Sequence, residues 1–107
     1  MTDNITRGSG NIFEDLGFEN SSEYQTKADL ALQIIKVIEK RKLTQKQAAD
    51  LIEAAQPDIS NLKSGQLKGF TLDRLFSFLL KLDRNIQIRV TKPRSKSKQG
   101  VLETVAA

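Results

Sequence analysis

The spacing of apolar residues predicts a chain built mainly from α-helices. In several stretches the apolar residues recur at intervals of three and four, which keeps one face of a helix buried. The first helix is expected from about Ser22 to Arg41, with a buried face of Ala28, Ala31, Ile34, Ile35 and Ile38. The last helix is expected after Thr71, with a buried face of Leu72, Leu75, Phe76, Leu79 and Leu82.

Two short helices are expected between these longer ones. Thr44 is a good N-cap, and Gln47 follows at the spacing of a capping box. Proline is tolerated in a first helical turn and poorly tolerated inside a helix, so Pro57 places the start of the next helix near Gln56. That helix is expected to end before Ser64 and Gly65, where glycine can terminate it. Only Ile59 and Leu62 can anchor it, which leaves its remaining polar face free for a ligand.

Residues 86–91 alternate apolar and polar side chains with period two, which predicts a half-buried strand. A lone strand leaves its backbone groups unpaired, so it needs a partner. One candidate is the same strand of a second subunit, antiparallel about a two-fold axis; the other is the segment at residues 11–13. We favour the dimer. Phe78 lies off the expected core stripe of the last helix, and the predicted dimer interface therefore consists of Phe78, Ile86, Ile88 and Val90.

These elements predict a four- to five-helix domain with one C-terminal strand. Residues 1–22 are expected to form a flexible acidic arm, residues 23–91 the domain, and residues 92–107 a basic, disordered tail. The arm holds a short apolar cluster, which either folds back on the domain or binds a partner; its members are Ile12, Phe13, Leu16 and Phe18.

Charge divides the chain into two parts. Residues 1–24 carry one arginine against five carboxylates, a net charge of −4, whereas residues 25–107 carry sixteen basic and eight acidic residues, a net charge of +8. We call the acidic residues 1–24 the leader. The basic charge of residues 25–107 favours a polyanionic partner for that part of the chain.

Composition excludes several classes of function. The 107 residues include no cysteine and no histidine, which removes disulfides, thiolate metal sites and the commonest general base. The carboxylates Asp50, Glu53 and Asp58 stand close in sequence without a metal-ligand or acid–base arrangement, so we expect no enzyme, no metal and no cofactor. No apolar run approaches the ~20 residues that cross a bilayer, and the start lacks a signal peptide. We expect a cytoplasmic protein without membrane contact.

The stretch Leu43–Gly65, LTQKQAADLIEAAQPDISNLKSG, resembles the Xre/Cro family of lambda-repressor-like helix-turn-helix proteins. The residues that match the family pattern without gaps are Leu43, Thr44, Gln45, Ala49, Ile52, Gln56, Ile59, Ser60, Leu62 and Gly65. The resemblance implies a lambda-repressor-like DNA-binding fold, with double-stranded DNA as the partner. The chain departs from the family pattern twice. Glu53 stands where the turn usually has glycine, and Ala55 stands where serine or threonine commonly caps the reading helix, a loss of ~1 kcal/mol.

The resemblance also implies roles for individual residues. Gln45 would bond phosphate and brace Gln56, and Gln56 would reach a base edge, since glutamine pairs well with adenine. Asp58 would either accept from a cytosine or merely be favoured by the helix N-terminus. Lys63 would meet phosphate. The complete predicted DNA-binding set is Thr44, Gln45, Gln56, Pro57, Asp58, Ser60, Asn61 and Lys63.

A wider likeness, from Gly8 to Val90, is to a subfamily that includes many antitoxins of HigBA-type toxin–antitoxin pairs. Two functions follow as expectations. The first is a homodimeric transcriptional repressor on a palindromic operator. The alternative is a protein-binding antitoxin, whose acidic leader covers the basic active surface of a small RNase toxin. The two roles are compatible, because antitoxins of this family commonly repress their own operon.

Overall fold

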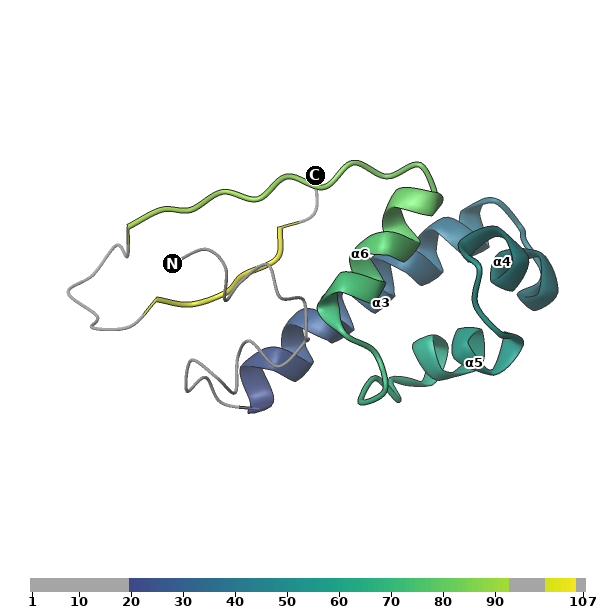
Figure 1. Ribbon diagram of the computed structural model, residues 1–107, viewed down its shortest axis with the longest axis horizontal. Coiled ribbons are helices and arrows are strands. Elements are labelled where there is room, and N and C mark those ends of the chain that lie inside the picture. The colour runs from purple at the N-terminus through teal and green to yellow at the C-terminus, as the bar shows by residue number, and fades with distance from the viewer. Residues whose placement is uncertain (1–19, 93–99, 106–107) are drawn as a thin grey trace.

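The apolar stripes of the sequence form helices at the expected places. The computed structural model describes residues 20–92 and 100–105, and the side chains from Glu23 onward. The described residues contain four helices, α3 (Asn20–Lys40), α4 (Gln45–Ile52), α5 (Gln56–Ser64) and α6 (Leu72–Lys81), arranged as in Figure 1. The predicted helical class is therefore confirmed for this part of the chain. The predictions for residues 1–19 of the leader, including its apolar cluster and its toxin-binding role, lie outside the described residues. Residues 20–22, which were assigned to the flexible arm, form the start of α3.

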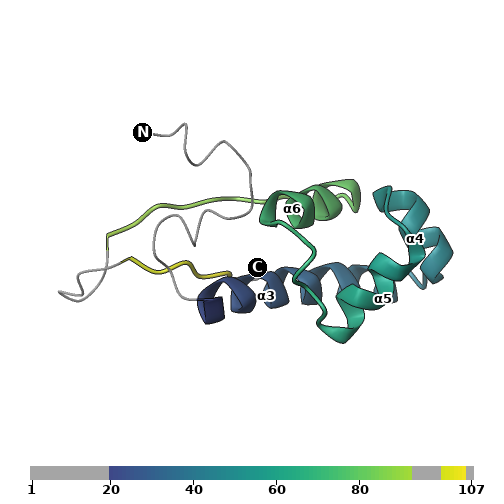
Figure 2. The same cartoon turned by 60° about the horizontal axis from the view of Figure 1, so that its bottom comes forward.

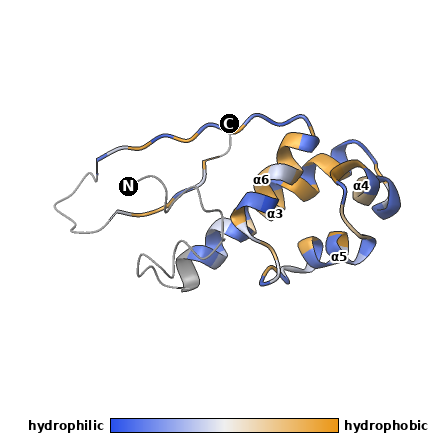
Figure 3. Ribbon diagram, in the orientation of Figure 1, coloured by the Kyte–Doolittle hydropathy of each residue, from blue (hydrophilic) through white to orange (hydrophobic). Residues whose placement is uncertain are grey.

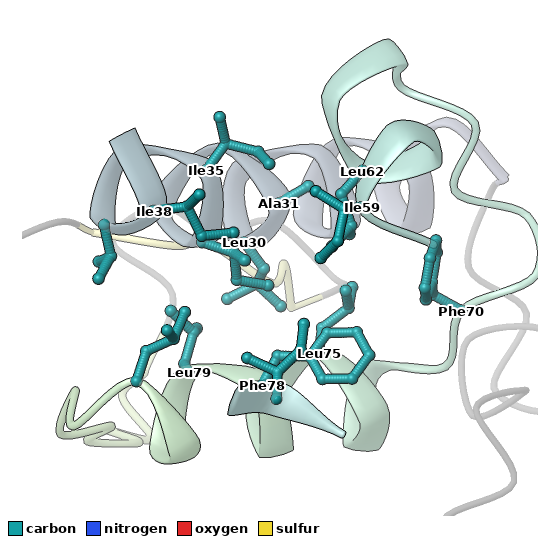
Figure 4. Packing of buried hydrophobic residues seen from close by; sticks show 14 of the residues in the cluster. Leu30, Ala31, Ile35, Ile38, Ile59, Leu62, Phe70, Leu75, Phe78 and Leu79 are labelled. Carbon is teal, nitrogen blue, oxygen red and sulfur yellow. The ribbon is translucent and has the colours of Figure 1, made fainter. Parts of the chain in front are cut away.

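The long helix α3 carries the core. Its 21 residues extend about 31 Å. Helix α6 packs along α3, and α4 and α5 pack against each other. Figure 2 shows α4 and α5 together at one end of α3. Apolar residues gather where α6 crosses α3 (Figure 3). In Figure 4, Leu75 and Leu79 of α6 face α3, and Ile59 of α5 reaches into the same cluster. The largest fully buried side chains are Ile34, Ile52, Ile59, Leu67, Leu75 and Leu82.

Polar side chains fix the helix ends that the sequence predicted. The Thr44 hydroxyl accepts from the Gln47 amide at 3.0 Å, and the Gln47 side chain accepts from the Thr44 amide at 2.8 Å. Both halves of the predicted capping box are therefore present. The Thr71 hydroxyl accepts from the Arg74 amide at 3.1 Å. Gly65 ends α5 in the left-handed conformation, with φ 82°, as glycine commonly does at this place.

The turn between α4 and α5 forms without glycine. Glu53 adopts the left-handed conformation, φ 59° and ψ 47°, and its amide bonds to carbonyls of the last turn of α4. The Ala54 amide donates to the Ala49 carbonyl at 2.8 Å, which closes the turn. The substitution of glutamate for the family's glycine therefore leaves the tight turn in place, at the steric cost that a Cβ carries in this conformation.

Replacing Glu53 with glycine is expected to stabilise the protein by about 1 kcal/mol, because glycine adopts positive φ without that cost. The change also removes the Glu53–Lys81 ion pair, but its 3.5 Å separation and exposed carboxylate make it worth little. Chemical denaturation measures the difference. Glu53→Ala is the matched control, since it removes the carboxylate and keeps the strain. An equal stability of both variants would contradict the expected gain.

The predicted C-terminal strand is absent from the described residues. Residues 84–92 follow α6 without strand or helix assignment, as an outstretched segment in which apolar and polar residues alternate (Figures 1 and 3). A strand requires a hydrogen-bonded neighbour, and the described residues supply none for this segment. Ile86 packs against the core, whereas Ile88 and Val90 are 77% and 92% exposed.

The prediction for Phe78 was wrong. Its side chain is 2% exposed, and its ring meets Phe70 edge-on with centroids 6.0 Å apart. It therefore offers almost no surface to a second subunit. The buried face of α6 is centred on Leu75, which brings Phe78 into the core and leaves Phe76 half-buried at its margin. Leu80, 56% exposed, is the large apolar residue that this helix presents to solvent.

The chain also returns to α3 near its end. Residues 100–105 have no regular secondary structure, and the Thr104 hydroxyl donates to a carboxylate oxygen of Asp29. The basic stretch at residues 93–99 lies outside the described residues, so the predicted disorder of the tail stays a prediction. No helix in the described ranges is both long and apolar enough to span a membrane.

Candidate nucleic-acid interface

Helix α5 divides sharply into a buried side and an exposed side. Ile59 is fully buried and Leu62 is 3% exposed, and together they hold the helix against the core. Five of the six predicted DNA-binding residues of α5 lie on the exposed side, namely Gln56, Pro57, Ser60, Asn61 and Lys63, whereas Asp58 is half-buried. A helix that is braced from behind and polar in front has the form that a DNA major groove about 12 Å wide accepts.

The first turn of α5 is capped by an unusual arrangement. Ala55 stands at the N-cap, where it has no side chain able to accept a hydrogen bond. The Asp58 carboxylate instead accepts from the Ala55 amide at 3.1 Å. Pro57 adds a residue that lacks an amide donor and so reduces the number of donors to satisfy. The turn that carries Gln56 is thus ordered by Asp58 rather than by the residue before the helix.

Asp58 also joins α5 to α6. Its carboxylate lies 2.9 Å from the Arg74 guanidinium. The same guanidinium stands over the rings of Phe70 and Phe78, 5.2 and 5.3 Å from their centroids. The sequence predicted Asp58 either as a base contact or as a charge favoured by the helix N-terminus. In the structure its carboxylate is bound to Arg74 and to the Ala55 amide. The sequence analysis did not identify Arg74 as a residue that supports α5. The only signal for it was its positive charge, opposite to that of Asp58, in the first turn of another helix.

Replacing Arg74 with alanine is expected to destabilise the protein by about 1–2 kcal/mol, since it removes a charged hydrogen bond and two cation–π contacts at a partly exposed site. Thermal or chemical unfolding measures the loss. Lys81→Ala is the matched control, because its ion pair with Glu53 is longer and more exposed. If both variants lose the same stability, Arg74 does not brace α5.

Helix α4 contributes its N-cap Thr44 and its first residue Gln45 to the candidate interface. Thr44 is exposed, and its hydroxyl is engaged in the capping box. The Ser60 hydroxyl donates to the Gln45 side-chain carbonyl at 3.4 Å. The predicted brace between Gln45 and Gln56 is therefore replaced by a contact one turn further along α5. Gln56 stays free of side-chain bonds within the described residues.

Positive charge near α5 is partly unpaired. Lys46 of α4 lies 3.4 Å from Asp50 on the next turn. Lys63 and Lys68 pair with no carboxylate in the described ranges of the chain. Both are exposed, so they are available for phosphate. Within residues 20–92 and 100–105, no group of three acidic side chains is arranged to hold a metal ion.

Comparison with known proteins agrees with this geometry. A family model described as a helix-turn-helix domain matches residues 12–91, which is most of the chain. A solved structure titled "Putative XRE Family Transcriptional Regulator" is 32% identical and has a TM-score of 0.76; the match covers 83% of this chain and all of that one. No curated protein matches. The chain belongs to the helix-turn-helix domain family and has a DNA-binding fold that resembles an XRE-family transcriptional regulator.

Proposed function

We propose that this protein is a sequence-specific DNA-binding transcriptional regulator, which inserts α5 into the major groove. The observation that carries the proposal is the division of α5. Ile59 and Leu62 are buried, while Gln56, Ser60 and Asn61 are exposed together on its other side. Gln56 and Asn61 are the side chains suited to adenine edges. Gln45, Thr44 and Lys63 stand beside them, where phosphate contacts position a protein without specifying sequence.

The regulator acts as a homodimeric repressor on a palindromic operator. Two copies would set their α5 helices about 34–36 Å apart, one DNA turn, on the two half-sites. Residues 86–91 supply the pairing edge in this proposal. Ile86 anchors the segment to the core, and the exposed Ile88 and Val90 remain for a second copy to cover. An antiparallel pair of such segments satisfies the backbone groups that one chain leaves unpaired.

Selection from a pool of random duplexes tests the reading function. Repeated rounds are expected to enrich a palindrome, and fluorescence anisotropy should then show tighter binding to it than to a scrambled duplex of equal length. The preference should persist as salt rises, while the non-specific affinity falls steeply. A protein that binds the selected and scrambled duplexes equally at every salt concentration does not have the proposed function.

The dimer has a separate test in Ile88→Lys. The variant keeps the core intact, because Ile88 is exposed in the single chain. Light scattering of the wild type is expected to give the mass of two chains, and the variant the mass of one. Arg89→Ala, a change on the neighbouring position of the same segment, should leave the mass unchanged. A monomeric wild type, or a variant that remains dimeric, rules out this pairing.

A further inference from the structure

A shallow apolar groove lies between the first half of α3 and the end of α5. Its volume is about 190 Å³. The lining consists of Ala28, Ala31, Leu32 and Ile35 from α3, with Leu62, Gly65 and Leu67 opposite. Lys63, a predicted phosphate contact of the reading helix, also lines it. The groove therefore joins an unfilled apolar surface to the proposed DNA-binding face.

Uncovered apolar surface continues along α3 toward its N-terminus. Tyr24 precedes Ala28 by four residues and Ala31 by seven, so all three share one stripe of the helix. Tyr24 is 50% exposed and Leu32 is 52% exposed. The Tyr24 hydroxyl donates to the Gly65 carbonyl at 3.2 Å, which places its ring next to the groove. Exposed apolar side chains beside a groove can serve as a binding surface.

The leader has the composition and the length to fill this surface. Four of the seven residues from Ile12 to Phe18 are apolar, and Glu14 and Asp15 lie between them. Phe13 stands seven residues before α3 begins, a span of about 23 Å when extended. Leu32 lies twelve residues into α3, about 18 Å along its axis. The leader can therefore turn back and reach the groove within one chain.

We propose that residues 12–18 of the same chain occupy the α3–α5 groove, and that Glu14 and Asp15 then compete with DNA phosphate for Lys63. The leader segment from Ile12 falls within the range that the helix-turn-helix family model matches, which supports a place for it in the domain. Lys63 is exposed and unpaired in the described residues. The docking stands by itself, whereas the competition rests on the proposed function.

Engineered disulfides test the docking in the full-length protein, because the chain has no cysteine of its own. The test variant combines Phe13→Cys with Leu32→Cys, and the matched control combines Phe13→Cys with Gln33→Cys. Gln33 is equally distant along α3 but turned about 100° around the helix, and it does not line the groove. Under mild oxidation, the test variant is expected to form its intramolecular disulfide several-fold faster than the control.

Equal rates for the two variants would mean that the leader samples α3 without docking, and would overturn the proposal. A predominantly intermolecular disulfide, seen as a doubled mass without reductant, would assign the groove to a second copy and also overturn it. In neither case does the result depend on DNA.

The oxidised test variant measures the competition. Its affinity for a duplex is expected to be several-fold weaker than that of the reduced form, with a salt slope lower by about 1, the contribution of one phosphate contact. Equal affinity and slope would overturn the competition while leaving the docking in place. If the reduced form, too, binds no duplex, the proposed function fails, and the disulfide rates still decide whether the leader docks.

Discussion

Replacing Ile59 with alanine is expected to lower the free energy of unfolding by about 2–5 kcal/mol. Ile59 is fully buried and is one of two side chains that hold α5 against the core. The substitution removes most of an apolar side chain and leaves a cavity that the surrounding helices fill only in part. Because small domains are stable by about 5–15 kcal/mol, a loss of this size unfolds a large fraction of the protein on mild heating.

Two controls separate the cavity from other effects of this change. Ile59→Val keeps most of the volume and is expected to cost about 0.5–1.5 kcal/mol. Leu80→Ala truncates a side chain that is 56% exposed, and it is expected to cost less than Ile59→Ala. Chemical denaturation monitored by circular dichroism measures all three. A loss below that of Leu80→Ala would show that Ile59 does not anchor α5.

Replacing Gln56 with alanine is expected to weaken binding to the selected operator by about 1–3 kcal/mol, roughly fivefold to 150-fold. Gln56 is exposed in the first turn of α5, and its side chain makes no bond in the described residues that the substitution would break. The variant should therefore unfold at the wild-type temperature. Anisotropy titrations against the operator, and against a duplex changed at one position of the half-site, measure the effect.

The matched control is Gln25→Ala, which alters an exposed glutamine on α3, where it bonds to Asp29. It should leave the operator affinity unchanged. Lys63→Ala provides a contrast, because loss of a phosphate contact weakens binding to all sequences and lowers the salt slope by about 1. If Gln56→Ala binds the operator as tightly as Gln25→Ala does, Gln56 does not read a base, and the register assigned to α5 is wrong.

Ile59 lies on the buried side of α5 and Gln56 on its exposed side. Their variants are therefore expected to lose different properties. Loss of Ile59 removes the support of the helix, so folding and binding fall together. Loss of Gln56 leaves the fold intact, so only the discrimination between sequences falls. Measuring stability and affinity for both variants therefore tests whether α5 is braced on one face and reads DNA with the other.

Much of the fold could be predicted from the sequence, because its signals are local. The Thr44 capping box and the Gly65 terminus involve groups within a few residues of one another. The division of α5 follows from two apolar positions three residues apart among polar ones. Backbone hydrogen bonds and helical periodicity operate at this range, so the four described helices and the exposed face of α5 could be predicted without knowing the fold.

Other features depended on contacts between distant residues. Helical spacing gave the general direction of the buried face of α6, but Phe70 and Arg74 decide that Phe78 lies inside it. The Asp58–Arg74 pair joins residues sixteen positions apart in different helices. Residues 86–91 likewise form a strand only beside a second strand, and the alternation of apolar and polar residues does not identify that second strand.

The sequence thus determined which segments are helical, where they begin and which side of α5 is polar, because those properties arise within single turns. The three-dimensional contacts were needed to show how Glu53 completes the turn, which residue orders the start of α5, and which aromatic ring of α6 is buried. Burial and ion pairing depend on residues that are distant in the sequence and close in the fold. The spacing of apolar residues does not identify those distant residues.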